Sequence, residues 1–166
     1  MRVAFTTLGC RLNQFETAGM RQRVDGAAWE TVDFDDAADV YVINSCSVTA
    51  RAEQKCRQLA RSIRRRHPDA RVVVAGCYAQ LSGEALMRTG EIDAVLGNEE
   101  KRELDLYIDR ISDGEAVHAV GRYRLGQEMA AEWIDDFGDH SRATIKVQEG
   151  CDLRCSFCAI WKARGP

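Results

Sequence analysis

The chain alternates short apolar segments, rich in β-branched residues, with longer segments of helical periodicity. We expect strands at residues 2–7, 29–33, 40–44, 71–75 and 94–96. We expect helices at residues 13–24, 48–66, 80–89 and 99–112. Strands that alternate with helices in this way form βαβ units, whose crossovers build a parallel sheet with helices on both faces. The sequence therefore predicts an α/β fold with a doubly wound parallel sheet.

This alternation stops after residue 116. We expect residues 1–116 to form the α/β domain and residues 117–140 to form a linker with at most one short strand. A last apolar strand is expected at residues 143–148, and it leads directly into a group of cysteines. One strand and one loop cannot bury a core of their own. We therefore interpret residues 141–166 as the start of a second domain that is truncated here.

The composition is that of a globular protein, because 45% of the 166 residues are hydrophobic and 30% are charged. No apolar run in the sequence approaches the roughly 20 residues of a membrane span. The first residues have a strand pattern and not the pattern of a signal peptide. We therefore expect a cytoplasmic location and no membrane contact. The sequence does not imply a stable protein partner.

The net charge of −3 does not by itself indicate nucleic-acid binding, but the charges are unevenly distributed. Residues 51–71 contain eight basic side chains and only two acidic ones. This run is either a solvated helix face or a surface that contacts RNA phosphates.

Three cysteines lie close together near the end of the chain, namely Cys151, Cys155 and Cys158 (the C-terminal cysteines). Disulfides are not expected in a reducing compartment, and zinc sites usually need a second cysteine pair, which is not nearby. Three thiolates on one loop can instead bind three irons of a four-iron cluster and leave one iron open to a small molecule. We interpret the triplet as cluster ligands, and the alternative is three thiols without a metal.

Three further cysteines each follow an expected strand and precede an expected helix, namely Cys10, Cys46 and Cys77 (the strand-end cysteines). Parallel strands point the same way, so residues just beyond their carboxyl ends gather at one edge of the sheet. Gly9 and Gly76 precede two of these cysteines, and a residue without Cβ suits a sharp turn beside a bulky group. The pattern predicts a second three-thiolate site, and the alternative is three separately buried cysteines.

Two of the expected helices have a recognisable inner side. In the helix at residues 13–24 we expect Phe15, Ala18, Gly19 and Gln22 to face inward. In the helix at residues 48–66, Cys56 lies on an apolar stripe with neighbours one and two turns away. We therefore interpret Cys56 as a core residue and not as a ligand.

Three amide side chains, those of Asn13, Asn44 and Gln80, flank the strand-end cysteines. They are candidate donors of hydrogen bonds to cluster sulfurs, which would tune the potential of a cluster. For Asn13 and Asn44 the alternative is helix capping and hydrogen bonding within loops. The sequence contains no evident Ser, His and Asp set, so we name no catalytic residue.

Three motifs surround the strand-end cysteines: TLGCRLNQ at residues 7–14, NSCSVT at residues 44–49 and AGCYAQ at residues 75–80. Together with the C-x3-C-x2-C spacing of the C-terminal cysteines, they resemble the N-terminal portion of the radical S-adenosylmethionine methylthiotransferases. The resemblance spans essentially the whole chain. It implies two 4Fe-4S clusters, an auxiliary one on the strand-end cysteines and a radical one, with S-adenosylmethionine, on the C-terminal cysteines.

The motifs are most similar to the branch of this family that converts N6-threonylcarbamoyladenosine in tRNA to its 2-methylthio derivative. The implied substrate is therefore tRNA, and the resemblance does not identify the electron donor. In the implied reaction, one S-adenosylmethionine methylates a sulfur held at the auxiliary cluster. A second is cleaved to a radical that abstracts hydrogen from C2 of the adenine. Other branches act on isopentenyladenosine in tRNA or on an aspartate of a ribosomal protein.

The chain departs from this branch at two places. Residues 159–162, AIWK, stand where the branch usually has Ile-Pro followed by an aromatic residue. The sequence also stops at Pro166, before nearly all of the radical barrel, so we interpret it either as an N-terminal part of a longer protein, inactive alone, or as a truncated relic. Two other classes stay open: a non-catalytic iron–sulfur module, and an α/β interaction domain with reduced thiols.

Overall fold

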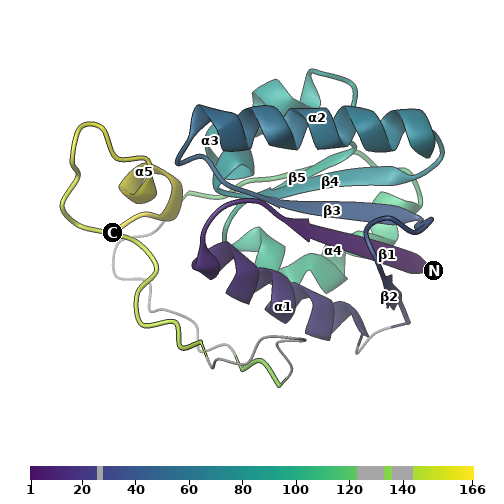
Figure 1. Cartoon of the computed structure of the whole chain (residues 1–166), viewed down its shortest axis with the longest axis horizontal. Coiled ribbons are helices and arrows are strands. Elements are labelled where there is room, and N and C mark those ends of the chain that lie inside the picture. Colours follow the sequence, from purple (N-terminus) through teal and green to yellow (C-terminus); the bar gives the residue numbers. More distant parts are fainter. Residues whose placement is uncertain (26–27, 123–132, 136–143) are drawn as a thin grey trace.

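The computed structural model describes residues 1–25, 28–122, 133–135 and 144–166 (Figure 1). Within them, one parallel sheet has the strand order β2-β1-β3-β4-β5-β6. The strands are β1 (Arg2–Thr7), β2 (Glu30–Val32), β3 (Val40–Ser45), β4 (Arg71–Gly76), β5 (Ala94–Leu96) and β6 (Val117–Ala119). The helices are α1 (Arg11–Asp25), α2 (Ala50–Arg66), α3 (Cys77–Met87), the 3-10 helix η1 (Glu100–Glu103), α4 (Leu104–Ser112) and α5 (Ile160–Arg164).

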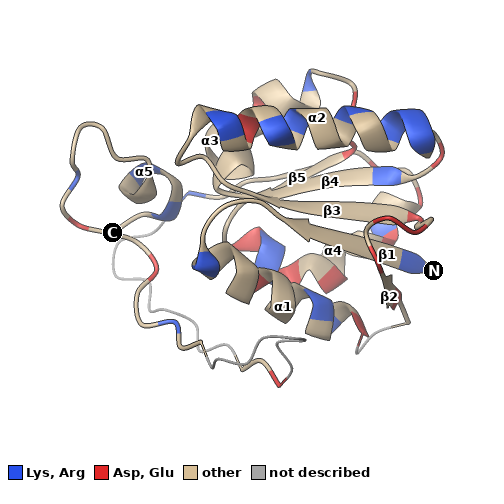
Figure 2. Ribbon diagram, viewed as in Figure 1, with Lys and Arg blue, Asp and Glu red and all other residues tan. Residues whose placement is uncertain are grey.

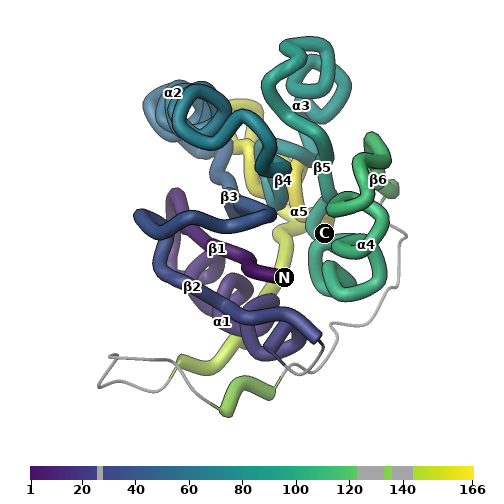
Figure 3. The backbone as a smooth tube through the Cα atoms, turned by 90° about the vertical axis from the view of Figure 1, so that its right-hand side faces the viewer, coloured from purple at the N-terminus to yellow at the C-terminus, as the bar shows by residue number. Residues whose placement is uncertain are grey.

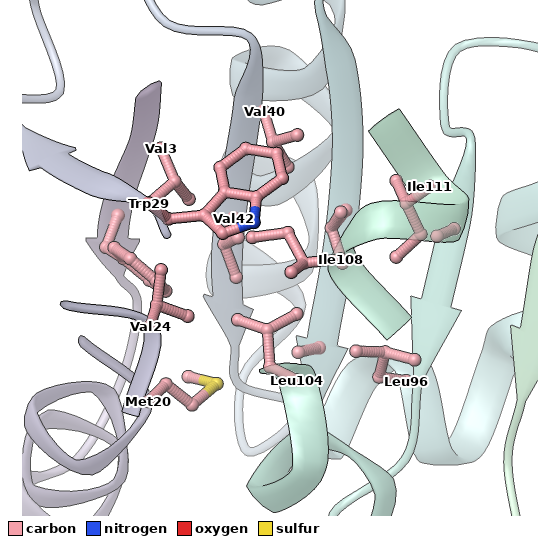
Figure 4. Close-up of a cluster of buried hydrophobic side chains, with 14 of the residues drawn as sticks. Val3, Met20, Val24, Trp29, Val40, Val42, Leu96, Leu104, Ile108 and Ile111 are labelled. Carbon is pink, nitrogen blue, oxygen red and sulfur yellow. The ribbon is translucent and has the colours of Figure 1, made fainter. Parts of the chain in front are cut away.

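Helices cover both faces of the sheet, which confirms the predicted doubly wound α/β fold. Helices α1 and α4 lie on one face, and α2 and α3 lie on the other (Figures 1 and 3). Successive side chains of a strand point to opposite faces of the sheet, so alternate residues pack against the helices on opposite sides. In β3, Val40 and Val42 pack in the α1/α4 layer (Figure 4), whereas Tyr41 and Ile43 pack in the α2/α3 layer.

The order of the strands creates a switch point between β1 and β3. Strand β2 pairs with β1 on one side, and β3 pairs with β1 on the other. Helix α1 therefore leaves β1 towards one face, while α2 leaves β3 towards the opposite face (Figure 1). Open α/β sheets bind ligands at the carboxyl ends of the strands beside such a point. The turns after β1 and β3 are thus the first place to look for a site.

Several elements differ from the boundaries expected from the sequence. The helix expected at residues 80–89 begins earlier, at Cys77, because β4 turns directly into α3. The helix expected at residues 99–112 is divided into η1 and α4. The short strand expected in the linker is β6, which pairs with β5. The sheet therefore extends beyond the domain boundary expected at residue 116.

The strand expected at residues 143–148 is absent from the part that the structure describes. Residues 144–148 have no regular secondary structure, and Ile145 and Val147 are largely exposed. These residues do not join the ladder of the described sheet, and a lone strand has no stability of its own. Residue 143 and the linker residues 123–132 and 136–140 lie outside the described residues.

The buried side of α1 also differs from the expectation. Phe15 and Gly19 are buried as expected, but Ala18 and Gln22 are only half-buried. The other buried residues of this helix are Asn13, Glu16, Thr17, Met20 and Val24. Helix α1 therefore carries an ionisable side chain into the interior of the protein.

Among the described residues, no helix is long and apolar enough to cross a membrane.

The turn from β4 to α3 depends on a close backbone approach at Gly76. This glycine has a φ of 91° and a ψ of −155°, a region that is essentially restricted to glycine. A Cβ at Gly76 would lie 2.5 Å from Asn44 Oδ1 and 2.8 Å from the carbonyl oxygen of Ser45. The turn that presents Cys77 therefore requires glycine for both conformation and space.

Two alanine substitutions separate these two requirements. Gly90 also has a positive φ, of 71°, but no atom lies within 4 Å of the position that its Cβ would take. We expect Gly90→Ala to lower the free energy of unfolding by about 1 kcal/mol, from backbone strain alone. We expect Gly76→Ala to lower it by about 3 kcal/mol or more, because the new methyl group meets backbone atoms. Urea unfolding followed by circular dichroism measures both, and equal losses would contradict the close approach at Gly76.

Candidate functional site

The three strand-end cysteines lie at the carboxyl edge of three adjacent strands. Cys10 lies in the turn from β1 to α1, Cys46 directly follows β3, and Cys77 directly follows β4. Cys46 and Cys77 are only 5% and 6% exposed, whereas Cys10 is exposed. The sheet therefore brings these thiols to one edge, next to the switch point.

Cys46 lies in close contact with the turn that carries Cys10. A Cβ on Gly9 would lie 2.4 Å from Cys46 Cβ and 2.8 Å from Cys46 Sγ. Burial raises the pKa of the Cys46 thiol, the Val48 N–H lowers it, and the neighbouring Cys77 and Cys10 raise it again. The glycine before Cys10 thus makes room for the thiol of the next strand.

Each strand-end sulfur has a polar neighbour. The Val48 N–H donates to Cys46 Sγ at 3.4 Å, and the Cys10 thiol donates to Asn13 Oδ1 at 3.8 Å. The Asn98 amide nitrogen lies 3.8 Å from Cys77 Sγ and donates to it. N–H donors beside a ligand sulfur orient that sulfur and tune the metal site that it forms.

The amide nitrogens of the three side chains named from the sequence donate to oxygen atoms in the structure. The amide nitrogen of Asn13 donates to two backbone carbonyls, and that of Gln80 donates to one. The amide nitrogen of Asn44 donates to a carbonyl and to a threonine hydroxyl. Their role as donors to cluster sulfurs stays a prediction. Asn98, which directly contacts Cys77 Sγ, was not singled out from the sequence.

Cys56 lies away from this edge, inside the layer between α2, α3 and the sheet. It is fully buried, and burial raises the pKa of its thiol to about 12. Its position on the inner stripe of α2 confirms the prediction of a core residue.

In the part of the chain that the structure describes, no group of three or more His, Cys, Asp or Glu side chains surrounds a single metal-ion position. An iron–sulfur cluster makes a different demand, because each cysteine binds a different iron. Three thiols from three adjacent strand ends supply the donor type and number that such a cluster uses, and the absence of a Cβ at Gly9 lets Cys46 pack against the turn that carries Cys10. The strand-end cysteines therefore fit a cluster, and their role as ligands stays a prediction.

The C-terminal cysteines lie on a loop whose ends are joined. The Cys151 N–H donates to the carbonyl oxygen of Gly165 at 2.9 Å. A Cβ on Gly150 would lie 2.1 Å from that same oxygen, so only glycine permits this closure. The Trp161 indole N–H donates to the carbonyl of Cys155 at 3.0 Å. Residues 150–165 therefore form a closed unit that carries the three thiols.

This loop lies against the carboxyl edge of the sheet, beside α3 (Figure 1). Cys155 is exposed, and Cys151 and Cys158 are half-buried. The structure therefore brings the two groups of cysteines to the same end of the domain.

A buried ion network connects the loop to the domain. Glu16 of α1, Lys101 of η1 and Arg164 of α5 are 2%, 0% and 4% exposed. The Glu16 carboxylate accepts from Lys101 Nζ at 2.7 Å and from two Arg164 nitrogens at 2.7 and 2.8 Å. Burial alone would raise the pKa of Glu16, but Lys101 and Arg164 lower it to about 2. Glu16 is therefore a carboxylate at neutral pH, held between two cations.

Residues 2–97 match the Uncharacterized protein family UPF0004. The chain is 41% identical, over 169 residues, to the threonylcarbamoyladenosine tRNA methylthiotransferase MtaB of Aquifex aeolicus (strain VF5), covering 99% of this chain and 40% of that protein. It is 38% identical, over 164 residues, to the protein of the same name from Bacillus subtilis (strain 168), covering 98% of this chain and 36% of that protein.

The chain is also 30% identical, over 168 residues, to the ribosomal protein uS12 methylthiotransferase RimO of Prochlorococcus marinus (strain MIT 9215), with 99% of this chain and 36% of that protein covered. It therefore spans well under half the length of these curated relatives. Among solved structures, the isolated REC domain of RcsB from Salmonella enterica serovar Typhimurium, in the apo form, matches with a TM-score of 0.53. That match covers 70% of this chain and 91% of the other at 12% identity, and it concerns the fold alone.

The low pKa of Glu16 predicts how the stability of this protein depends on pH. The ordinary pKa of a glutamate is 4.5, and that of folded Glu16 is about 2. A lowered pKa means that ionised Glu16 stabilises the fold above pH 4.5 and loses this effect as the pH falls to 2. This difference corresponds to about 3 kcal/mol of stability.

Urea unfolding of the chain and of its Glu16→Gln variant, at a series of pH values, measures this contribution. We expect the difference in free energy of unfolding between the two proteins to shrink by about 3 kcal/mol between pH 5 and pH 2. A difference that stays constant over this range would contradict an ionised, buried Glu16.

Proposed function

Because this chain belongs to the Uncharacterized protein family UPF0004, we propose that it is the N-terminal part of a radical S-adenosylmethionine methylthiotransferase. The observation that carries the proposal is the position of two groups of three cysteines at one end of the domain. The proposed substrate is threonylcarbamoyladenosine in tRNA. The relatives named for that reaction, at 38% and 41% identity, support this branch over the ribosomal-protein branch, at 30%.

In this proposal the strand-end cysteines hold an auxiliary 4Fe-4S cluster, and the C-terminal cysteines hold the cluster that binds S-adenosylmethionine. When bound, these groups supply the radical and the sulfur that methylthiolation requires. The protein contributes placement and exclusion of water. Cys46 and Cys77 are buried at their strand ends, so solvent has little access to their sulfurs.

The polar neighbours of the thiols have a defined part in this proposal. The N–H groups of Val48 and Asn98 point at Cys46 Sγ and Cys77 Sγ, where they stabilise negative charge on sulfur. Asn98 is itself held by Lys101, whose ammonium donates to its Oδ1 at 2.9 Å. Lys101 therefore orients the Asn98 side chain, which donates to Cys77 Sγ.

The basic residues within 51–71 include two arginines that pair with acidic side chains and others that are exposed on α2. Arg61 donates to Glu91 at 2.8 Å, and Arg64 pairs with Asp93, so these two arginines fix α2 to the domain. The exposed basic side chains that remain on α2 form a positive face of the helix (Figure 2). They are Arg51, Lys55, Arg65 and Arg66. This face suits contact with tRNA phosphates, and a solvated helix face without a partner is the alternative.

Nucleoside analysis of tRNA tests the proposed substrate. A strain that lacks the complete gene should lose the 2-methylthio derivative of threonylcarbamoyladenosine, and the gene should restore it. The gene carrying Cys46→Ala should fail to restore it, whereas the matched control Cys56→Ala alters a buried cysteine outside the site and should succeed. Unchanged tRNA in the deletion strain would contradict the proposed substrate.

Anaerobic reconstitution with iron and sulfide tests the proposed cofactors on this chain directly. We expect about eight irons per chain, since each 4Fe-4S cluster contains four. Cys46→Ala should lower the content to about four, and Cys56→Ala should leave it unchanged. Iron-free protein that is still folded would contradict both sites. Iron binding by the complete protein without any change in tRNA would favour a non-catalytic iron–sulfur module.

A further inference from the structure

We propose that the buried pair of Glu16 and Lys101 is a receptor for Arg164, and that Arg164 thereby positions the loop of the C-terminal cysteines against the strand-end cysteines. Glu16 and Arg164 have no part in the proposed function, and Lys101 enters it only by holding Asn98. The contacts among these three side chains do not require a bound metal.

The contact between Glu16 and Arg164 has the geometry of a specific recognition site. One terminal nitrogen of Arg164 donates to Glu16 Oε1 at 2.7 Å, and the other donates to Glu16 Oε2 at 2.8 Å. Such a two-pronged contact fixes the direction as well as the distance of the guanidinium group. Lysine cannot form it, because an ammonium group is a single point of charge.

The balance of charge indicates that the receptor exists before Arg164 arrives. Glu16 and Lys101 both belong to the α/β domain and form a neutral pair, with Lys101 Nζ 2.7 Å from Glu16 Oε2. Arg164 adds a positive charge, and Glu149, just before Gly150, supplies a second negative charge 3.0 Å from the guanidinium. The loop thus brings Glu149 as a counter-charge for Arg164, and Glu149 also pairs with Lys146 and with Arg102.

The domain holds the loop at both ends. Arg164 at its far end binds Glu16, and Glu149 at its near end forms an ion pair with Arg102 of η1. The backbone bond from Cys151 to Gly165 ties these two ends together. The segment that carries the three thiols is therefore docked as one unit.

The same contacts reach the turns that carry the strand-end cysteines. Arg164 donates to Asn13 Oδ1 at 2.9 Å, and the Asn13 amide donates to the carbonyls of Leu8 and Ser45, near Cys10 and Cys46. On the other side, Asn98 donates to the carbonyl of Ala163 at 2.6 Å and also to Cys77 Sγ. These hydrogen bonds thus connect the loop to all three turns that carry the strand-end cysteines.

Hydrogen exchange of the 166-residue chain, analysed by mass spectrometry, tests this role. The variants are Arg164→Lys and Arg164→Gln, and the matched control is Arg154→Lys, an exposed arginine of the same loop. Both Arg164 variants leave the Glu16–Lys101 pair intact, so the α/β domain should stay folded. We expect exchange in residues 150–165 to become about 10- to 100-fold faster in both, as for loss of a charge-assisted contact.

Exchange in β3 and β4 should be unchanged in these variants, and Arg154→Lys should behave like the original chain. Equal acceleration in the loop and in the sheet would overturn the proposal, because Arg164 would then stabilise the whole fold. Unchanged exchange in the loop would also overturn it. Full restoration of loop protection by Arg164→Lys would show that charge alone suffices, and would overturn the requirement for a two-pronged contact.

Discussion

The parallel direction of β1, β3 and β4 is the constraint on which the rest of this structure depends. Because the three strands point the same way, the residues that follow them meet at one edge of the sheet. Cys10, Cys46 and Cys77 occupy these places, and the strand order also puts the switch point beside the first two. Residues far apart in the chain thus form one site without any long loop.

The second organising feature is a charged cluster inside the same edge. Burying an ion pair is seldom a large source of stability, because desolvation offsets the attraction between the charges. Geometric specificity is the better explanation for Glu16, Lys101 and Arg164, since each accepts or donates in a fixed direction. These buried charges therefore hold the loop of the C-terminal cysteines beside the turns of the strand-end cysteines. Their hydrogen bonds also reach Asn13 and Asn98.

Much of this arrangement was predictable from the sequence, because strand and helix periodicities are local signals. They predicted the α/β fold and the gathering of the strand-end cysteines. The role of Glu16 was not predicted, although Glu16 lies one helical turn from the buried Asn13 and Met20. Lys101 likewise lies one turn from the buried Leu104. A charge on an apolar stripe is the signal that identifies such a residue. Its partner Arg164 lies 148 positions away, and only the tertiary structure shows that pairing.

The central claim is that the strand-end cysteines alone form a cluster site on this α/β domain. The most direct test is iron analysis with Mössbauer spectroscopy on a reconstituted variant in which Cys151, Cys155 and Cys158 are all replaced by alanine. Our account predicts about four irons per chain with the spectrum of a 4Fe-4S cluster. A folded variant that binds no iron would contradict it.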